Sequence, residues 1–392
     1  MPTADAIVIG AGIFGVSTAI HLSEAGYKVV LIEQGAIPHP LSASDDISKA
    51  VRVEYGSDEL YFNMARESIE GWKKWNVILG VDVYHEVGYT MFSKRNISSE
   101  VQSYEQASLH LLRKHGYSFE SFYGEEISAR FPCIREGAFA EAVYNPAGGY
   151  VESGTAIKLL VGHYKHEIKY MTQCKVDKVI KDGGKAIGVQ LASGELIYAG
   201  VTVVAAGVYS AELLPELTDF FKVTGHPLFW LSPGSSKMYQ APALSVYSAD
   251  ISNSGWYGFP HHLSADVVKI GLHAQGTLQD PHNEQRLVTE EELTLLDEFL
   301  KSTFSELSIS DLVLSKKCLY TDTYDGDYLL SMHPELENCA IATGGSGHGM
   351  KMGPMIGAVM KDVIAGISNQ YTERFRWRDP SIMQGHEEAR FQ

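Results

Sequence analysis

The stretch Ala6-Ile7-Val8-Ile9-Gly10-Ala11-Gly12-Ile13-Phe14-Gly15 decides the fold class of this chain. Its first four residues form a short apolar run, which is typical of a buried parallel strand. The glycines that follow have the spacing G-x-G-x-x-G, and apolar residues then recur at helical spacing as far as Gly26. Lys28–Glu33 has the pattern of the next parallel strand, so the chain opens with a βαβ unit of the kind that binds a dinucleotide.

The residues of this unit predict how a dinucleotide would be held. Gly10 permits a tight turn, Gly12 lets a pyrophosphate approach the backbone, and Gly15 lets the helix pack on the strand. Glu33 lies 18 residues after Gly15 and would accept hydrogen bonds from the adenosine ribose. The pattern alone does not distinguish FAD from NAD.

Composition limits the class of partner. The 392 residues include 48 acidic and 32 basic side chains, and the net charge of −16 argues against nucleic acid or an anionic membrane as a partner. The hydrophobic fraction of 45% is ordinary for a globular enzyme with a large core.

The sequence also bears on the compartment. No apolar run approaches transmembrane length, the N-terminus lacks the basic region of a signal peptide, and the last three residues are not the common peroxisomal tripeptide. We therefore expect a cytoplasmic protein.

The cysteines predict neither a disulfide framework nor a metal site. Cys133, Cys174, Cys318 and Cys339 are widely spaced, with no C-x-x-C pair and no zinc-finger spacing of cysteine and histidine. This usage favours a reducing compartment.

Periodicity along the chain indicates the domain organisation. We expect helices at 58–80, 100–116, 154–165, 289–304 and 354–365, strand character at 81–93, and antiparallel strands within 221–278. Segments 188–191 and 202–207 are expected in the parallel sheet, with a final strand at 338–343. Because nucleotide-binding patterns lie at both ends of the chain, we expect a discontinuous nucleotide domain of residues 1–85, 150–220 and 318–392. Residues 86–149 and 221–317 would form the substrate domain.

Two segments near the C-terminus carry most of the chemical information. In Lys316-Lys317-Cys318-Leu319-Tyr320-Thr321, two lysines bias the cysteine thiol toward the nucleophilic thiolate. Gly344–Pro354 combines several glycines with His348 and Lys351. Glycines let backbone N–H groups approach a ligand closely, and a basic residue among them suits an electron-rich or anionic ligand.

With the βαβ unit, these segments resemble the monomeric sarcosine oxidase and amadoriase (fructosyl amino acid oxidase) family of flavoproteins. The resemblance spans nearly the whole chain and includes Ser44–Arg52, Tyr257–Pro260, Lys269–His273 and Phe375–Arg378. The last of these segments, and lysine rather than arginine at position 49, favour the amadoriase and saccharopine oxidase branch. The resemblance implies an α/β plus α+β fold. A Rossmann-like FAD-binding domain would be interleaved with a substrate domain built on a mainly antiparallel sheet.

The resemblance also implies the reaction. It predicts an FAD-dependent oxidase of a secondary amine, such as an N-methyl or N-glycated amino acid, that forms an imine or iminium and reduces oxygen to hydrogen peroxide. Water would hydrolyse the iminium, or an aromatic substrate would trap it by ring closure, with which the 21 tyrosines and Trp256 are compatible. FAD would be attached covalently through Cys318, and the protein would be a monomer.

Five residues are expected to act on the substrate or on oxygen. The resemblance places Lys351 near the reactive nitrogen of the flavin, where a cation stabilises the charge that develops on oxygen. Lys49 and Arg52 are three residues apart, within reach of one another from one turn or loop, and would tune the flavin or bind substrate. Tyr257 and His273 match positions that line the substrate pocket. The pocket must also lower the pKa of the amine, because the flavin oxidises only the neutral form.

The residues expected to bind the cofactor come from the βαβ unit, the segment after it, two middle segments and the two C-terminal segments. They are Gly10, Gly12, Ile13, Phe14, Gly15, Glu33, Ser48, Lys49, Val176, Ala206, Gly207, Cys318, Gly345, Gly347, His348, Gly349, Met350 and Lys351. Structural alternatives stay open for the chemical residues. Cys318 could be a buried core thiol, and Lys351 a solvated charge at a helix end.

Two other functions also stay open. A flavin-dependent amine dehydrogenase would pass electrons to an acceptor other than oxygen, and its reduced flavin would react slowly with air. A non-catalytic protein would bind the dinucleotide for structure alone, and no amine would reduce the cofactor.

Overall fold

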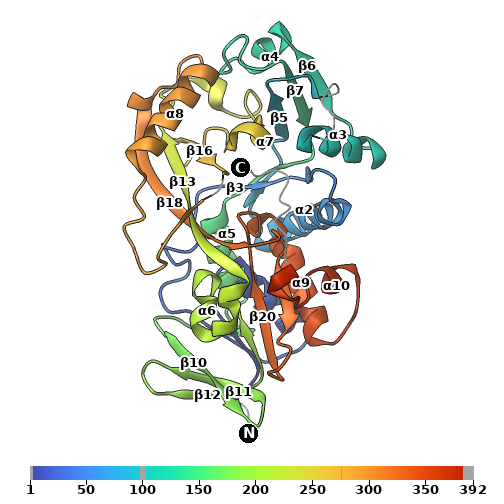
Figure 1. The fold of residues 1–392 in the computed structure, drawn as a ribbon, viewed down its shortest axis with the longest axis vertical. Coiled ribbons are helices and arrows are strands. Elements are labelled where there is room, and N and C mark those ends of the chain that lie inside the picture. Colours follow the sequence, from blue (N-terminus) through green and yellow to red (C-terminus); the bar gives the residue numbers. More distant parts are fainter. Residues whose placement is uncertain (1–2, 98–102, 275, 383–392) are drawn as a thin grey trace.

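The computed structural model describes residues 3–97, 103–274 and 276–382, and Figure 1 shows that they form two parts. Each part is built around one large sheet, and the chain crosses between the two sheets several times. The protein also has a small three-stranded sheet, whose strand order is β3 (Lys49–Val51), β8 (Gly149–Val151) and β4 (Tyr84–His85). The predicted combination of a Rossmann-like α/β part with a mainly antiparallel α+β part is confirmed.

The first sheet has eight strands and contains the predicted βαβ unit. Five of its strands pair in parallel with one another: β1, β2, β9, β12 and β20. The other three, β10, β11 and β19, pair antiparallel with their neighbours. The strands are β1 (Ala4–Ile9), β2 (Val29–Ile32), β9 (Ile168–Met171), β10 (Val176–Asp182), β11 (Lys185–Leu191), β12 (Leu196–Val204), β19 (Leu329–Met332) and β20 (Cys339–Thr343).

The prediction that residues 188–191 belong to the parallel sheet is wrong. These residues lie in β11, which pairs antiparallel with both β10 and β12. The two residues between β10 and β11 are Gly183 and Gly184, both with positive φ. Such a pair forms a tight hairpin turn, and a hairpin joins antiparallel strands.

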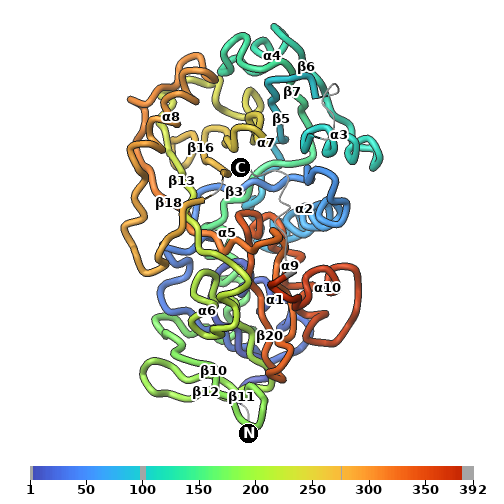
Figure 2. Tube along the Cα trace, in the orientation of Figure 1, coloured from blue at the N-terminus to red at the C-terminus, as the bar shows by residue number. Residues whose placement is uncertain are grey.

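Two helices from opposite ends of the chain pack side by side under this sheet (Figure 2). Helix α1 (Ile13–Glu24) contacts α9 (Gly353–Ile364) so closely that a Cβ on Gly357 would lie 2.2 Å from the carbonyl oxygen of Ser17. The hydroxyl of Ser17 donates to the carbonyl of Gly353 and accepts from the N–H of Gly357. This contact joins the first and last segments of the predicted nucleotide domain.

The remaining helices of this part lie where the sequence predicts them or fill short connections. Helix α2 (Glu59–Leu79) is capped by Asp58 and ends at Gly80 with φ 67°. Its Trp72 Nε1 donates to the carbonyl of Lys351 at 3.0 Å, which fixes the backbone of the glycine-rich segment. The others are α5 (Ser153–His163), α6 (Ser210–Leu213) and α10 (Gln370–Arg374). None of the helices in the described ranges is long and apolar enough to cross a membrane.

The second sheet has nine strands, and all its pairings are antiparallel except that between β14 and β5. Its strands are β5 (Tyr89–Ser93), β6 (Glu120–Tyr123), β7 (Glu141–Asn145), β13 (Phe221–Leu231), β14 (Val246–Ala249), β15 (Trp256–Gly258), β16 (Val268–Leu272), β17 (Thr277–Leu278) and β18 (Leu312–Thr323). Its helices are α3 (Tyr104–Lys114), α4 (Glu125–Arg130), α7 (Ile251–Ser254) and α8 (Glu290–Thr303). The predicted cap of α8 is confirmed, because Thr289 and Glu292 form a capping box.

Strand β18 was not expected as a strand, and it runs through the domain boundary proposed at residue 318. It pairs with β13 along nearly its full length, and in Figure 1 the two strands run together from the upper part of the molecule into the lower part. Cys318 therefore lies within a strand of the second sheet. The same strand carries Leu319–Thr321 to the cavity of the first part.

Candidate active site

Two adjoining cavities lie where the two parts meet. The cofactor cavity, of about 300 Å³, lies over the carboxyl ends of β1, β2, β12 and β20. The substrate cavity, of about 550 Å³, lies against the second sheet. Lys49, Tyr320, Gly347 and Met350 line both, so the two cavities meet at these residues.

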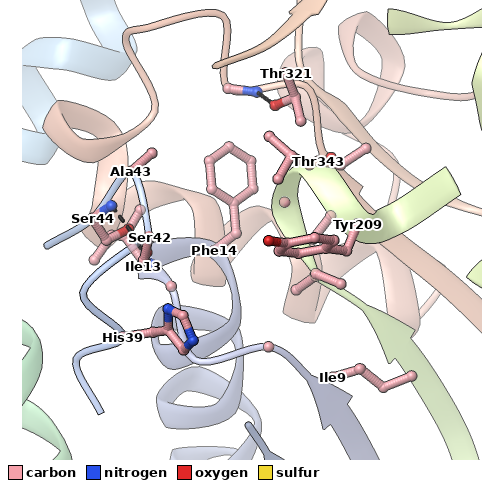
Figure 3. Close-up of a pocket in the computed structure, with 18 of the residues that line it drawn as sticks. Ile9, Ile13, Phe14, His39, Ser42, Ala43, Ser44, Tyr209, Thr321 and Thr343 are labelled. Atoms are coloured by element: carbon pink, nitrogen blue, oxygen red, sulfur yellow. Dashed lines mark hydrogen bonds between the residues drawn. The ribbon is translucent and has the colours of Figure 1, made fainter. Parts of the chain in front are cut away.

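The cofactor cavity has the shape that a dinucleotide requires at the start of α1. Gly10 has φ 100°, and a Cβ on Gly15 would lie 1.9 Å from the carbonyl oxygen of Gly10, so the turn and the helix pack directly on each other. Helix α1 begins after Gly12, and Figure 3 shows Ser42, Ala43 and Ser44 beside Ile13 at this helix start. Backbone N–H groups and hydroxyls therefore gather where a pyrophosphate would bind.

Glu33 closes the other end of this site at the end of β2. Its carboxylate lines the cavity and accepts from the N–H groups of Ala11 at 2.8 Å and Gly35 at 3.0 Å. These bonds fix the carboxylate at the position predicted for a ribose contact.

Most residues predicted to bind the cofactor line this cavity. They are Gly10, Gly12, Ile13, Phe14, Glu33, Lys49, Val176, Ala206, Gly207, Gly345, Gly347, Gly349 and Met350. Gly15 lies behind the turn, and Ser48 is buried with its carbonyl bonded to Lys269. Cys318 is buried and borders a third, smaller cavity next to the first.

His348 and Lys351 line the substrate cavity rather than the cofactor cavity. His348 Nε2 lies 3.1 Å from the carbonyl of Gly326, which can only accept, so this nitrogen carries the proton. Its Nδ1 faces the hydroxyls of Tyr55 at 3.1 Å and Tyr328 at 2.8 Å. These contacts hold the imidazole ring in one orientation at the cavity wall.

Two cations of the substrate cavity flank one aromatic ring. The guanidinium carbon of Arg52 lies 5.4 Å from the centre of the Tyr55 ring, and Lys351 Nζ lies 4.8 Å from it. Arg52 Nη1 also donates to the hydroxyl of Tyr104, which in turn donates to the carbonyl of Glu54. Arg52 and Lys351 thus line the same cavity from two segments, both beside the Tyr55 ring, and both lie near the buried carboxyl of Glu54, whose pKa is raised by burial.

A buried cluster of charges lies where the cavities meet. The Asp46 carboxylate, 1% exposed, lies 2.9 Å from Lys49 Nζ and 2.5 Å from Lys269 Nζ. Lys49 Nζ also lies 3.9 Å from Cys318 Sγ. Lys49 and Arg52 come from an extended strand and the residue after it, not from a helical turn, yet both line the substrate cavity.

The cluster shifts the pKa values of its members in opposite directions. Burial raises the pKa of Asp46, but the two ammonium groups outweigh burial and hold it well below its usual range. Burial lowers the pKa of Lys269 to about 8, although Asp46 acts in the opposite direction. Burial lowers the pKa of Lys49 as well, but Asp46 and the Cys318 thiol raise it above its ordinary value.

The sequence pattern predicted no role for Lys269, although the segment Lys269–His273 carries part of the resemblance. The available signal was a lysine between Val268 and Ile270 in a strand that is buried along almost its whole length. Tyr257 and His273, which were predicted, do line the substrate cavity. The aromatic residues that sequence analysis missed there are Tyr55, Tyr61, Tyr89, Tyr104, Tyr247, Phe259 and Tyr320.

Comparison with known proteins identifies the family. The sequence profile of DAO, the FAD dependent oxidoreductase family, matches residues 5–363. The chain belongs to this family. It is thus an FAD-dependent oxidoreductase, which confirms the predicted cofactor, and its glycine turn, helix start and Glu33 fit the FAD of that family.

Relatives extend over the whole of this oxidoreductase. Human peroxisomal sarcosine oxidase is 25% identical, with 97% of this chain and 98% of that protein covered. L-saccharopine oxidase of Schizosaccharomyces pombe is 24% identical, with 95% and 93% covered. Amadoriase II of Aspergillus fumigatus shares the fold with a TM-score of 0.83 at 21% identity, covering 99% of this chain and 93% of that one. The predicted resemblance to these oxidases is confirmed.

Removing the shared counter-charge tests the buried cluster. Asp46→Asn is expected to lower the free energy of unfolding by about 3–5 kcal/mol at neutral pH, because two buried ammonium groups lose their carboxylate. The folded pKa of Asp46 lies below its ordinary 3.8, so this contribution is present above that pH and is lost as the pH falls below it. Urea unfolding of both proteins at neutral and acid pH measures the difference.

Asp297→Asn is the matched control, since Asp297 pairs with an exposed lysine, Lys301, on one face of α8. Its loss should be at most about 0.5 kcal/mol. Equal losses in the two variants would contradict the importance of the buried cluster.

Proposed function

We propose that this flavoprotein is an oxidase of N-substituted amino acids that forms an imine or iminium and transfers the electrons to oxygen. The observation that carries the proposal is that Arg52 and Lys351 both lie beside the Tyr55 ring and both line the cavity that adjoins the cofactor cavity. A guanidinium and an ammonium group that converge on one volume suit a carboxylate. The relatives are named as oxidases of sarcosine and of saccharopine, and both of these compounds are N-substituted amino acids.

The size and lining of the cavity favour a substrate larger than sarcosine. About 550 Å³ lies within the range of roughly 300–1,000 Å³ that encloses drug-sized ligands. Many of the lining residues are aromatic, and flat rings of a ligand pack well against such walls. We therefore propose an N-substituted amino acid with a bulky or aromatic group. Its iminium product would be hydrolysed, or trapped by ring closure if the ring carries a nucleophilic carbon.

Each residue then has a defined part in the reaction. When bound, FAD accepts a hydride equivalent from the substrate and passes electrons to oxygen, which yields hydrogen peroxide. Arg52 and Lys351 hold the substrate carboxylate, so that the amine faces Lys49 and Tyr320, where the cavities meet. Burial among aromatic walls and the nearby cations lowers the pKa of the bound amine and favours its neutral form. Tyr257 and His273 form part of the wall that encloses the substrate.

The position of Lys351 supports a different role from the one expected at the sequence level. It lies beside Arg52 in the substrate cavity and not in the cofactor cavity. We assign oxygen activation instead to the Lys49 and Lys269 cluster, where one carboxylate accompanies two ammonium groups and the cluster stays positive. A buried positive charge stabilises negative charge that develops on oxygen.

An amine panel tests the function directly. Under anaerobic conditions, N-methyltryptophan, fructosyl amino acids and saccharopine should bleach the flavin spectrum with kcat/KM at least about tenfold above that of sarcosine, because the larger groups fill the cavity. Admission of air should restore the spectrum within seconds and release hydrogen peroxide. Lack of reduction by every amine would refute the oxidase, and reduction followed by slow reoxidation would favour the dehydrogenase.

Two lysine variants separate substrate binding from oxygen activation. Lys351→Met should raise the dissociation constant of a carboxylate substrate by about 10- to 100-fold, with reoxidation little changed. Lys269→Met should slow reoxidation by about 100-fold or more, with substrate binding within a few fold of wild type. Stopped-flow reduction and reoxidation measure both steps, and Lys361→Met, on the surface of α9, serves as control. The reverse pattern would restore the oxygen role of Lys351.

We also propose that FAD is attached covalently through Cys318, whose thiol lies buried beside Lys49 at the junction of the cavities. After acid precipitation, flavin absorbance should stay in the pellet of the wild type and move to the supernatant in Cys318→Ser. Cys174→Ser is the control, because Cys174 lines the cofactor cavity and its replacement should leave the flavin in the pellet. Wild-type flavin in the supernatant would refute the covalent link.

A further inference from the structure

Glu54 is a buried acid that lies behind the two cations of the substrate cavity. None of its surface is exposed, and it does not line the cavity. The hydroxyl of Tyr104 accepts from Arg52 Nη1 at 2.6 Å and donates to the backbone carbonyl of Glu54 at 2.6 Å, so a single hydroxyl joins the guanidinium to the backbone of Glu54. The charges of Arg52 and Lys351 both act on its carboxyl. Glu54 is therefore within electrostatic reach of the groups that suit a substrate carboxylate.

Hydrogen bonds to the Glu54 carboxyl compensate only part of a negative charge. Asn145 Nδ2 donates to Oε1 at 2.8 Å. Oε2 is buried and has no hydrogen-bond partner among the residues that the structure describes. A buried carboxylate is stable only where donors or opposite charges compensate its oxygens. The ionised form of Glu54 therefore depends on the nearby cations.

The other titratable groups around Glu54 are tyrosines from the surrounding elements. Burial raises the pKa of each of them, to about 12 for Tyr89, and the charge of Glu54 acts in the same direction. Their hydroxyls are thus neutral near neutral pH. These tyrosines are Tyr84 in β4, Tyr89 in β5, Tyr104 in α3 and Tyr117 shortly after α3.

Binding of a carboxylate changes the balance at Glu54. Burial raises the pKa of Glu54, whereas the Asn145 hydrogen bond and the charges of Arg52 and Lys351 lower it. A substrate carboxylate held by the two cations adds a negative charge near Glu54 and displaces water from the cavity. Both changes disfavour the ionised form and raise the pKa of Glu54 further. Asn145 does not line the cavity, so its hydrogen bond is present in both states.

We propose that Glu54 is a proton-linked counter-charge of the substrate site, which takes up a proton from solvent when a substrate carboxylate binds to Arg52 and Lys351. The occupied site then holds two cations and one anion, and its net positive charge favours the neutral, oxidisable form of the amine. With Glu54 ionised, two anions would cancel the two cations and remove this effect. The inference rests on the proposed function, because it requires Arg52 and Lys351 to bind a carboxylate.

Proton uptake is measured on the oxidised flavoprotein with indole-3-acetate, a carboxylate that has an aromatic ring and no amine to oxidise. Titration calorimetry at about pH 7, in two buffers of different ionisation enthalpy, should show uptake of roughly half a proton or more per ligand. Because binding takes up a proton, the dissociation constant should rise with pH, by about three- to tenfold between pH 6 and 8. Infrared difference spectra should show the carbonyl band of a neutral carboxyl appear on binding.

Glu54→Gln keeps the shape of the side chain but cannot ionise, so it should abolish the uptake, the pH dependence and the infrared band. Glu141→Gln is the matched control, because Glu141 is likewise buried, accepts from the N–H of Ile97 at 2.7 Å and lies outside the substrate cavity. It should take up as many protons as the wild type. Uptake that persists in Glu54→Gln would belong to another group, such as a histidine of the cavity wall, and would overturn the inference. Wild-type affinity that does not change with pH would overturn it without any variant.

Lys351→Met distinguishes failure of this inference from failure of the proposed function. It should weaken binding of indole-3-acetate by about 10- to 100-fold, whereas the uncharged indole-3-acetamide should bind both proteins alike and without proton uptake. If indole-3-acetate does not bind, or binds Lys351→Met as tightly as the wild type, the carboxylate site of the proposed function fails and the inference fails with it. Weaker binding to Lys351→Met, together with unchanged uptake in Glu54→Gln, would overturn the inference alone.

Discussion

The carboxylate of Asp46 is buried between two ammonium groups that belong to different sheets. Lys49 lies in the small sheet, and Lys269, which is 223 residues from Asp46 in the sequence, lies in the second sheet. The carbonyl of Asp46 also accepts from Ser153 Oγ and from the N–H of Gly154 at the start of α5. Burying these charges separately would cost several kcal/mol for each ion, so the three elements are stable only when they meet. That meeting point is the junction of the cofactor and substrate cavities.

The same arrangement explains how an acidic protein presents a positive active site. The carboxylate of Asp46 is the counter-ion of two lysines, Lys49 and Lys269, so the cluster keeps an excess of positive charge. Farther along the substrate cavity, aromatic rings lie beside Arg52 and Lys351, and burial raises the pKa of the nearby Glu54 carboxyl, which favours its neutral form. A ring stabilises a cation without cancelling its charge, so these ring contacts leave both side chains charged. The net charge of −16 thus describes the surface of the protein and not the interior on which the chemistry depends.

Features with a local sequence signal were predictable, and features that depend on distant pairing were not. The turn at Gly10, the helix start after Gly12 and the Thr289 cap each follow from a few neighbouring residues. Strand β18 has lysines at its centre and no simple alternation, because its two ends face different surroundings, and it was missed. His348 was predicted beside the cofactor because of its glycine neighbours, but its ring lies in the substrate cavity, where Tyr55 and Tyr328 contact it. The role of Lys269 depends on its ion pair with Asp46, and no local sequence pattern connects these two residues.

Interleaving of the two parts has a mechanistic consequence. Strand β18 begins at the edge of the second sheet and ends against the cofactor cavity, so residues a few positions apart face different ligands. Thr321 bonds the N–H of Gly345 in the glycine-rich segment, Tyr320 lines both cavities, and Cys318 lies beside Lys49. A rigid strand fixes the spacing of these three side chains, since neighbouring residues advance by about 3.3 Å. Cofactor and substrate are therefore positioned by one continuous element, and a shift of the second sheet against the first would displace both sites together.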